Sequence, residues 1–205
     1  MFLSFDGIDG AGKTTQMDLC CDWLREQGGE VVRCRDPGST PLGERIRDIL
    51  LHGEADLPIG RRSEMLLYMA ARAQLVDEVI RPALAANKIV VSDRYLLANL
   101  VYQGYAGGLD VEAVRRVGLV AIEQTEPDAV FLLDISPEAA DRRLNRTLDR
   151  MERQGGDYRR RLRDGFLAEA SRAKEHIHVI NADRPVEAVQ AEIRQIADQL
   201  LHMEG

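Results

Sequence analysis

The stretch that decides the fold reads Gly7-Ile8-Asp9-Gly10-Ala11-Gly12-Lys13-Thr14. It fits the phosphate-binding pattern G-x-x-x-x-G-K-[ST] and directly follows an apolar run at residues 2–5. The glycines allow the backbone to curl, so that several N–H groups point at phosphate oxygens. Lys13 would bring a positive charge to the β- and γ-phosphates, and the Thr14 hydroxyl is placed to ligate Mg²⁺. The helix that follows would direct its N-terminal dipole at the same anion.

A Gly-rich turn that binds nothing is the alternative interpretation of this stretch. The position of the stretch argues against it, because a strand-like run precedes it and a helix-like segment, residues 14–27, follows it. A phosphate loop needs this strand–loop–helix context. The sequence therefore predicts a nucleotide-binding site.

Short apolar runs alternate with longer helical patterns along the rest of the chain. The expected strands are residues 2–5, 30–34, 88–92, 129–133 and 177–180. The expected helices lie near residues 14–27, 41–51, 61–86, 96–103, 111–124, 137–146, 157–174 and 186–202. Strands of four or five residues separated by such helices imply crossover connections and a parallel, buried sheet. The sequence therefore predicts a three-layer α/β fold with a five-stranded parallel sheet flanked by helices.

The bulk composition is that of an ordinary globular domain. A length of 205 residues predicts one domain over residues 1–205, with room for a small inserted lid. The net charge of −7 disfavours a nucleic-acid-binding surface, and no run approaches the ~18 apolar residues of a membrane span. No signal peptide is visible, and the three cysteines give no metal-ligand spacing. We interpret Cys20, Cys21 and Cys34 as reduced packing residues of a cytoplasmic protein.

An acid and an arginine, Asp93 and Arg94, stand at the end of the expected strand 88–92. Ligands of open α/β sheets sit beyond the carboxyl ends of the strands, so both side chains should face the same crevice as the phosphate loop. A carboxylate there can hold Mg²⁺ through water, and a guanidinium can grip a phosphate. The alternative is an Asp–Arg ion pair without a ligand. Together with the phosphate loop, the functional interpretation is favoured.

Two further segments carry weaker signals. Residues 35–40, Arg-Asp-Pro-Gly-Ser-Thr, follow the second expected strand, and a Pro-Gly turn is their simpler interpretation. Tyr68 and Arg72 are four residues apart and therefore share one helix face. A ring and a guanidinium there could hold a flat base, although an aromatic residue in a helix more often belongs to the core.

Together these pieces resemble the bacterial thymidylate kinases, the dTMP kinases of the nucleoside monophosphate kinase group. The resemblance runs over nearly the whole chain and rests on the segments GIDGAGKTT, RDPGST, YMAARAQ, DRY, NLVYQG and LDRME. It implies a P-loop kinase fold with a lid, and a homodimer. Two departures are RDPGST in place of the commoner R-E-P-G-G-T, and Leu97-Ala98 where many members carry Asp-Ser.

The resemblance assigns the phosphoryl donor to the phosphate loop. The ATP site would comprise Gly7, Ile8, Asp9, Gly10, Ala11, Gly12, Lys13, Thr14 and Thr15. Thr14 and Asp93 would serve Mg²⁺, with Asp93 acting through water. Arg143 lies where an arginine flanks the donor adenine in the family.

The acceptor site is assigned to residues scattered along the chain. Arg94 would grip the dTMP phosphate, and Asp9 would reach the sugar hydroxyl. Tyr68 would stack on thymine, while Arg72 and Gln103 would hydrogen-bond the base. The remaining acceptor contacts fall on Tyr102, which would crowd the 2′ position and favour deoxyribose, and on Asn99, Asp36 and Pro37.

Family members differ in whether an extra catalytic arginine lies in the phosphate loop or in the lid. The variable loop positions 8–11 hold no arginine here, whereas the charged segment 146–158 holds several. On composition alone that segment is a solvated loop. The resemblance instead makes it a lid in which Arg146 and Arg150 are catalytic and Arg153 lies beside them.

The implied reaction is direct in-line transfer of the ATP γ-phosphoryl group to the 5′-phosphate of dTMP, a step in dTTP synthesis. Lys13, Arg94 and the lid arginines would stabilise the moving group, and lid closure would exclude water. The alternatives are a kinase for another nucleotide or nucleoside, and a nucleotide-dependent switch or binding module. A GTPase would ordinarily carry N-K-x-D, and Asn87-Lys88 lacks the acid.

Overall fold

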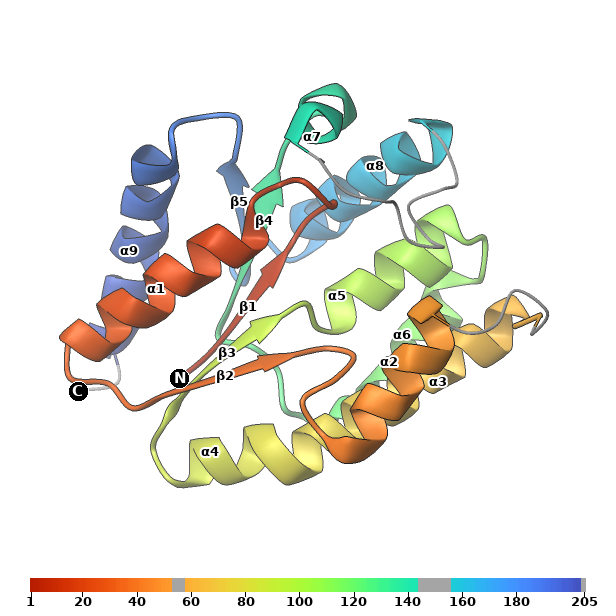
Figure 1. The fold of residues 1–205 in the computed structure, drawn as a ribbon, viewed down its shortest axis with the longest axis horizontal. Helices are drawn as coiled ribbons and strands as arrows, with labels where there is room; N and C mark the ends of the chain where they lie inside the picture. The colour runs from red at the N-terminus through yellow and green to blue at the C-terminus, as the bar shows by residue number, and fades with distance from the viewer. Residues whose placement is uncertain (53–57, 144–155, 204–205) are drawn as a thin grey trace.

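The computed structural model describes residues 1–52, 58–143 and 156–203. Its strands form one parallel five-stranded sheet in the order β2-β3-β1-β4-β5 (Figure 1). They are β1 (Phe2–Asp6), β2 (Val31–Arg35), β3 (Ile89–Asp93), β4 (Ala129–Asp134) and β5 (Ile177–Asn181). The predicted strands agree with these bounds closely, because a buried parallel strand has a nearly continuous apolar sequence.

Most helices also lie close to their predicted ranges. The α-helices are α1 (Lys13–Glu26), α2 (Pro41–His52), α3 (Arg61–Leu75), α4 (Arg81–Ala85), α5 (Leu96–Asn99), α6 (Val111–Ile122), α7 (Pro137–Arg143), α8 (Gly156–Arg172) and α9 (Val186–Met203). The predicted helix 61–86 is interrupted by a π-helical segment, η1 (Val76–Ile80). The predicted helix 96–103 changes after α5 into a second one, η2 (Leu100–Ala106). Most of the predicted lid, and the end of the predicted helix 137–146, lie outside the described residues.

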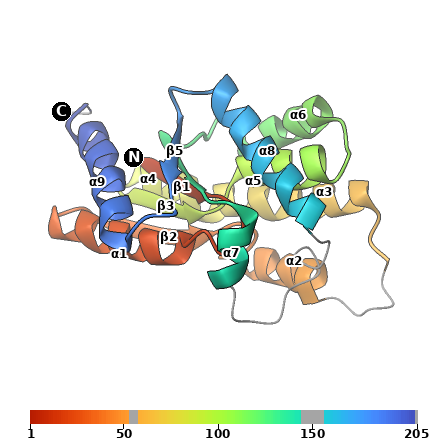
Figure 2. The ribbon, with the colours of Figure 1, turned by 90° about the horizontal axis from the view of Figure 1, so that it is seen from above.

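The helices make two layers, one on each face of the sheet (Figure 2). Helices α1 and α9 cover one face, while α4, α5, α6 and α8 lie on the other. Between the layers, Phe5 of β1 packs on Phe131 of β4 with ring centroids 5.1 Å apart. The three cysteines are free and buried among these core side chains, as predicted. The predicted three-layer α/β fold is therefore confirmed.

The carboxyl ends of the strands lie at one edge of the sheet and place polar residues there. The phosphate loop follows β1, Asp36 follows β2, and β3 ends at Asp93. Because β1 lies between β3 and β4, the chain leaves the sheet here at a point where the strand order reverses, which is where open α/β sheets bind ligands. No helix among residues 1–52, 58–143 and 156–203 is long and apolar enough to cross a membrane.

Candidate active site

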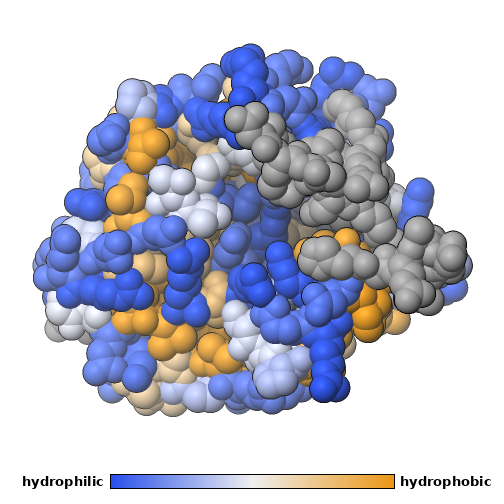
Figure 3. Space-filling model, viewed as in Figure 1, coloured by the Kyte–Doolittle hydropathy of each residue, from blue (hydrophilic) through white to orange (hydrophobic). Residues whose placement is uncertain are grey.

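A cavity of about 880 Å³ lies over this edge of the sheet. In Figure 3 it is the hollow near the centre of the face shown, and much of its border is hydrophilic. The loop after β1, the ends of β2 and β3, the helices α1, α2, α3, α5, α7 and α9, and η2 all contribute residues to its lining. The cavity therefore joins segments that are far apart in the sequence.

One end of the cavity is formed by the phosphate loop. Gly12 is the N-cap of α1 and has φ 91°, a left-handed conformation that favours glycine. No side chain caps the first turn of α1, and no acidic residue lies in it. Gly7 allows the loop to approach β4, since a Cβ there would meet the Leu133 carbonyl oxygen at 2.6 Å. The result is a helix N-terminus that is open to an anion.

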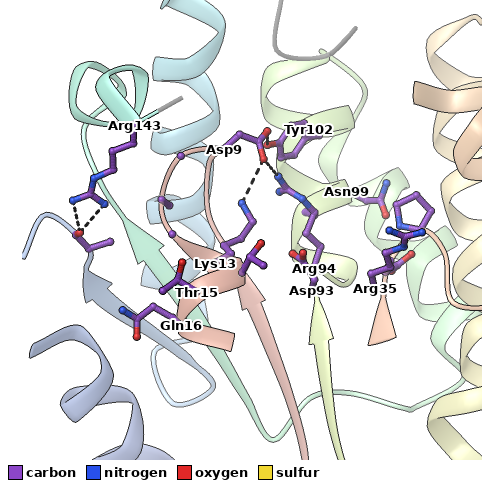
Figure 4. A pocket seen from close by; sticks show the side chains of 18 of the residues that line it. Asp9, Lys13, Thr15, Gln16, Arg35, Asp93, Arg94, Asn99, Tyr102 and Arg143 are labelled. Atoms are coloured by element: carbon purple, nitrogen blue, oxygen red, sulfur yellow. Dashed lines mark hydrogen bonds and ion pairs between the residues drawn. The ribbon is translucent and has the colours of Figure 1, made fainter. Parts of the chain in front are cut away.

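Lys13 lies inside this loop and is buried (Figure 4). Its Nζ donates to the carbonyl oxygens of Gly7, at 3.0 Å, and Ile8, at 3.1 Å, and lies 3.5 Å from Asp9 Oδ1. Burial lowers the pKa of Lys13, and the nearby Arg94 guanidinium lowers it further. The ammonium is thus already desolvated, so that a phosphate would interact with it strongly.

Arg94 extends from the end of β3 toward the same loop. Its Nη2 lies 2.6 Å from Asp9 Oδ1, and its Nη1 donates to the Gly7 carbonyl oxygen at 3.2 Å. The Asp–Arg ion pair is therefore made with Asp9 and not with the neighbouring Asp93. One oxygen of Asp93, Oδ1, is buried and has no hydrogen-bond partner in the part of the chain that the structure describes.

The other end of the cavity contains a buried ion pair. Arg72 of α3 donates from Nε to Asp36 Oδ2 at 2.5 Å, and from Nη2 to the Tyr95 carbonyl oxygen at 3.1 Å. Burial raises the pKa of Asp36, and the Arg72 guanidinium offsets part of this rise. The third nitrogen of Arg72, Nη1, contacts a weak acceptor, the Met69 sulfur, at 3.2 Å. Tyr68 lines the cavity one turn before Arg72.

The segment α5–η2 supplies the side wall. Asn99 Nδ2 donates to Gln103 Oε1 at 2.7 Å, and Gln103 Nε2 donates to Glu64 Oε1 at 3.1 Å. Asn99 Oδ1 is buried without a hydrogen-bond partner among the described residues. Tyr102 lies with its ring 4.9 Å from the Arg94 guanidinium carbon, and its hydroxyl is 3.4 Å from Asp9 Oδ2.

Arg143, at the end of α7, borders the phosphate-loop end of the cavity. Its Nη1 and Nη2 both donate to the Ala182 carbonyl oxygen at 3.1 Å, in the segment that follows β5 (Figure 4). The plane of the guanidinium is thereby held beside the cavity.

Comparison with known proteins identifies the family. A family model described as thymidylate kinase matches residues 5–193. The thymidylate kinase of Symbiobacterium thermophilum is 41% identical over 202 residues, which cover 98% of this chain and 94% of that protein. That of Bifidobacterium longum is 42% identical over 98% of each chain. This chain belongs to the thymidylate kinase family. A crystal structure of thymidylate kinase from Ehrlichia chaffeensis is similar, with a TM-score of 0.81 at 30% identity, and covers 96% of this chain and 98% of that one.

Most site residues predicted from the thymidylate kinase resemblance line this cavity. These are Asp9, Gly10, Ala11, Gly12, Lys13, Thr14, Thr15, Asp36, Pro37, Tyr68, Arg72, Asp93, Arg94, Asn99, Tyr102, Gln103 and Arg143. Gly7 and Ile8, at the start of the loop, do not line the cavity but offer carbonyl oxygens to Lys13. Arg146, Arg150 and Arg153 lie outside the described residues.

Other cavity residues of this thymidylate kinase family member were missed by the sequence analysis. Arg47 of α2 donates to the Pro37 carbonyl oxygen at 2.9 Å, a contact that no local pattern signals. Gln16 and Arg184 also line the cavity. Arg184 follows β5, so the strand-end rule that found Asp93 could have found it too.

Proposed function

We propose that this member of the thymidylate kinase family transfers the γ-phosphoryl group of ATP directly to the 5′-phosphate of dTMP, giving dTDP and ADP. Membership of the family makes it a phosphotransferase that acts on dTMP. The observation that carries the proposal further is the cavity itself. The phosphate loop with Lys13 follows β1, and Arg72 with Tyr68 lines the same cavity beside Asp36, which follows β2. Arg94 lies between them, because β3 stands between β2 and β1 in the sheet.

The donor would occupy the loop end. Lys13, the open N-terminus of α1 and the loop N–H groups would hold the phosphates of ATP. Arg143 would lie against the adenine, because its guanidinium plane is fixed by two hydrogen bonds to Ala182. An incoming γ-phosphate would compete with Asp9 for Lys13, which lies 3.5 Å from that carboxylate.

The acceptor base would lie between the α3 face and η2. Arg72 Nη1 is the donor that would reach a carbonyl oxygen of thymine, because Nε and Nη2 are already engaged by Asp36 and Tyr95. The Asn99 Oδ1 atom, buried without a partner among the described residues, would accept the thymine N–H. Gln103 would then act mainly by orienting the Asn99 amide. Tyr68 would stack on the base.

The acceptor phosphate would be gripped by Arg94, whose guanidinium lies between the loop and Tyr102. Asp9, which pairs with Arg94, would reach the sugar hydroxyl, and Tyr102 would crowd the 2′ position. Because the acceptor phosphate is largely ionised at pH 7, no general base is needed.

The residues present also fit a magnesium ion. Thr14 is exposed to the cavity, and Asp93 offers a buried carboxylate oxygen that no described residue hydrogen-bonds. Hydroxyl and carboxylate oxygens are the ligands that Mg²⁺ prefers. We propose that Thr14 ligates it directly and Asp93 through water. Bound there, the ion would neutralise charge on the β- and γ-phosphates.

Three parts of the proposal rest on the family resemblance alone. Arg146 and Arg150 of the lid would add positive charge to the transferring group. The whole protein would be a homodimer and would act in the cytoplasm.

The test is acceptor-dependent ADP release by the purified chain with ATP and Mg²⁺. We expect strong release with dTMP, and little with dUMP, UMP, dCMP, dGMP, AMP or thymidine. Preference for another acceptor would leave the phosphate-loop assignment intact but overturn the roles of Tyr68, Arg72 and Asn99. No acceptor-dependent release at all would overturn the kinase proposal.

A further inference from the structure

The helix α8 packs unusually closely against η2 at Gly165. A Cβ built on Gly165 would lie 2.8 Å from Tyr105 Cβ, 2.9 Å from Tyr105 Cγ and 3.2 Å from Val101 Cγ1. Carbon atoms do not approach this closely without something moving. Gly165 lies in the interior of α8, where glycine costs about 1 kcal/mol relative to alanine. Gly165 is thus unfavourable for the stability of α8, but the close approach of η2 requires a residue without a side chain there.

Two neighbours of Gly165 strengthen the same contact. Phe166 meets the Tyr102 ring edge-on, with centroids 6.3 Å apart and an interplanar angle of 77°. The buried carboxylate of Glu169 accepts a hydrogen bond from the Tyr105 hydroxyl at 2.9 Å. One face of α8 therefore holds η2 by close approach, by ring packing and by a hydrogen bond.

This contact includes a cavity residue, Tyr102. Besides packing on Phe166, Tyr102 has the Arg94 guanidinium over its ring, and its hydroxyl lies 3.4 Å from Asp9 Oδ2. Its ring therefore touches both α8 and the charged groups of the site. A shift of η2 relative to α8 would move the Tyr102 ring and hydroxyl relative to the cavity, because Val101, Tyr102 and Tyr105 share the short π-helical segment.

We propose that Gly165 is a positioning residue that sets the preference of the enzyme for a deoxyribose acceptor. Because position 165 has no side chain, η2 can pack closely against α8. This close packing fixes the distance between Tyr102 and the acceptor sugar. The inference rests on the proposed function, in which the acceptor sugar lies against Tyr102. Gly165 itself touches no substrate and acts through Tyr102.

The first test is Gly165→Ala, with dTMP and its ribose counterpart, 5-methyluridine monophosphate, as acceptors. We expect the ratio of kcat/KM for the deoxy over the ribo acceptor to change by about tenfold, since displacements of about 1 Å at a reacting site have effects of this order or larger. The KM for ATP should change less than this ratio, because the contact reaches the phosphate loop only indirectly, through Tyr102 and Asp9. Ser171→Ala is the control, since Ser171 is exposed on the same helix and alanine favours the helix there too.

A double-mutant cycle separates positioning from a general structural effect. In a Tyr102→Ala background, Gly165→Ala should leave the acceptor ratio unchanged, because the residue through which it acts is gone. Phe166→Leu removes the aromatic ring that packs on Tyr102. In the wild-type background it should shift the ratio of kcat/KM for the two acceptors by a smaller amount. It serves as the second variant if Gly165→Ala does not fold.

The outcomes are distinguishable. An unchanged ratio in folded Gly165→Ala, or an equal change with and without Tyr102, overturns the inference. Absence of dTMP turnover in the wild-type chain overturns the proposed function. A changed ratio that disappears without Tyr102, with a smaller change in the KM for ATP, supports the positioning role.

Discussion

The two ends of the cavity are built in different ways. The end that we propose for the donor is built mainly from one contiguous segment, the phosphate loop, whose polar groups are backbone groups and the Lys13 ammonium. The acceptor end combines side chains from β2, α3, β3 and η2, and most of their polar atoms already bond one another. A substitution at the donor end should therefore act alone, whereas one at the acceptor end should spread to its neighbours.

The largest effect is expected at Lys13. If Lys13 holds the phosphates as proposed, Lys13→Ala should lower kcat by about 10³-fold or more, because a desolvated cation is lost. Steady-state ADP release with saturating dTMP measures it. Thermal unfolding should show the fold intact, since the variant removes a buried charge. A variant that keeps most of its kcat would mean that the loop does not hold the donor.

For the buried pair Asp36–Arg72 we expect the opposite of Lys13, a loss of stability as well as of function. Asp36→Ala leaves the Arg72 charge buried and unpaired, and should destabilise the fold by about 3–5 kcal/mol while weakening dTMP binding. Adding Arg72→Met should restore much of the stability but not the affinity. Urea unfolding and dTMP titration of the two variants check this. Equal stabilities of the single and double variants would show that the pair is not coupled as its geometry indicates.

Asp6, the last residue of β1, should contribute strongly to the pH dependence of stability. Burial raises the pKa of its carboxyl from 3.8 to about 7, although Arg94 and Lys13 lower it in part. The folded chain therefore binds more protons than the unfolded one between about pH 4 and pH 7, and stability falls as pH rises through this window.

Asp6→Asn removes this dependence. At pH 8 it should be more stable than the wild type by about 2–4 kcal/mol, and the difference should vanish near pH 4. Urea unfolding across the pH range measures it. The exposed Asp22→Asn should keep the wild-type slope. Parallel curves for Asp6→Asn and wild type would rule out a protonated carboxyl at this position.

The smallest effect is expected at the rim of the donor end. Arg143→Ala should raise the KM for ATP about fivefold and leave the KM for dTMP unchanged, because it removes only the proposed contact between the guanidinium and the adenine. The neighbouring exposed Arg142→Ala is the control. If the KM values of both substrates rose together, the two ends would be less independent than their construction indicates.

The difference between a contiguous loop and a pocket built from scattered residues also explains what could be predicted from the sequence. The loop from Gly7 to Thr14 is contiguous, so its chemistry can be read without knowing the fold. The strands could be placed because both of their faces are buried. Arg47 could not be found, because its contact with Pro37 depends on how α2 crosses the end of β2.

The local backbone of the helices was also beyond the sequence analysis. The π-helical turns η1 and η2 carry no distinctive residues, since such a turn depends on what packs against it. The helix expected to reach residue 124 ends at Ile122, because Glu123 and Gln124 adopt left-handed conformations with φ 44° and 64°. For Gly165, the sequence shows only a glycine inside a helical pattern, and the reason for it appears only in the contact with Tyr105.

Two of the three buried cysteines can report how often each half of the protein opens. Burial raises the pKa of the Cys20 and Cys34 thiols to about 12, so neither reacts with an alkylating reagent until its surroundings open. Cys20 lies on α1, which carries the donor loop, and Cys34 lies on β2, two residues before Asp36. The rates at which these two thiols are alkylated therefore report separately on how often the donor and acceptor halves come apart.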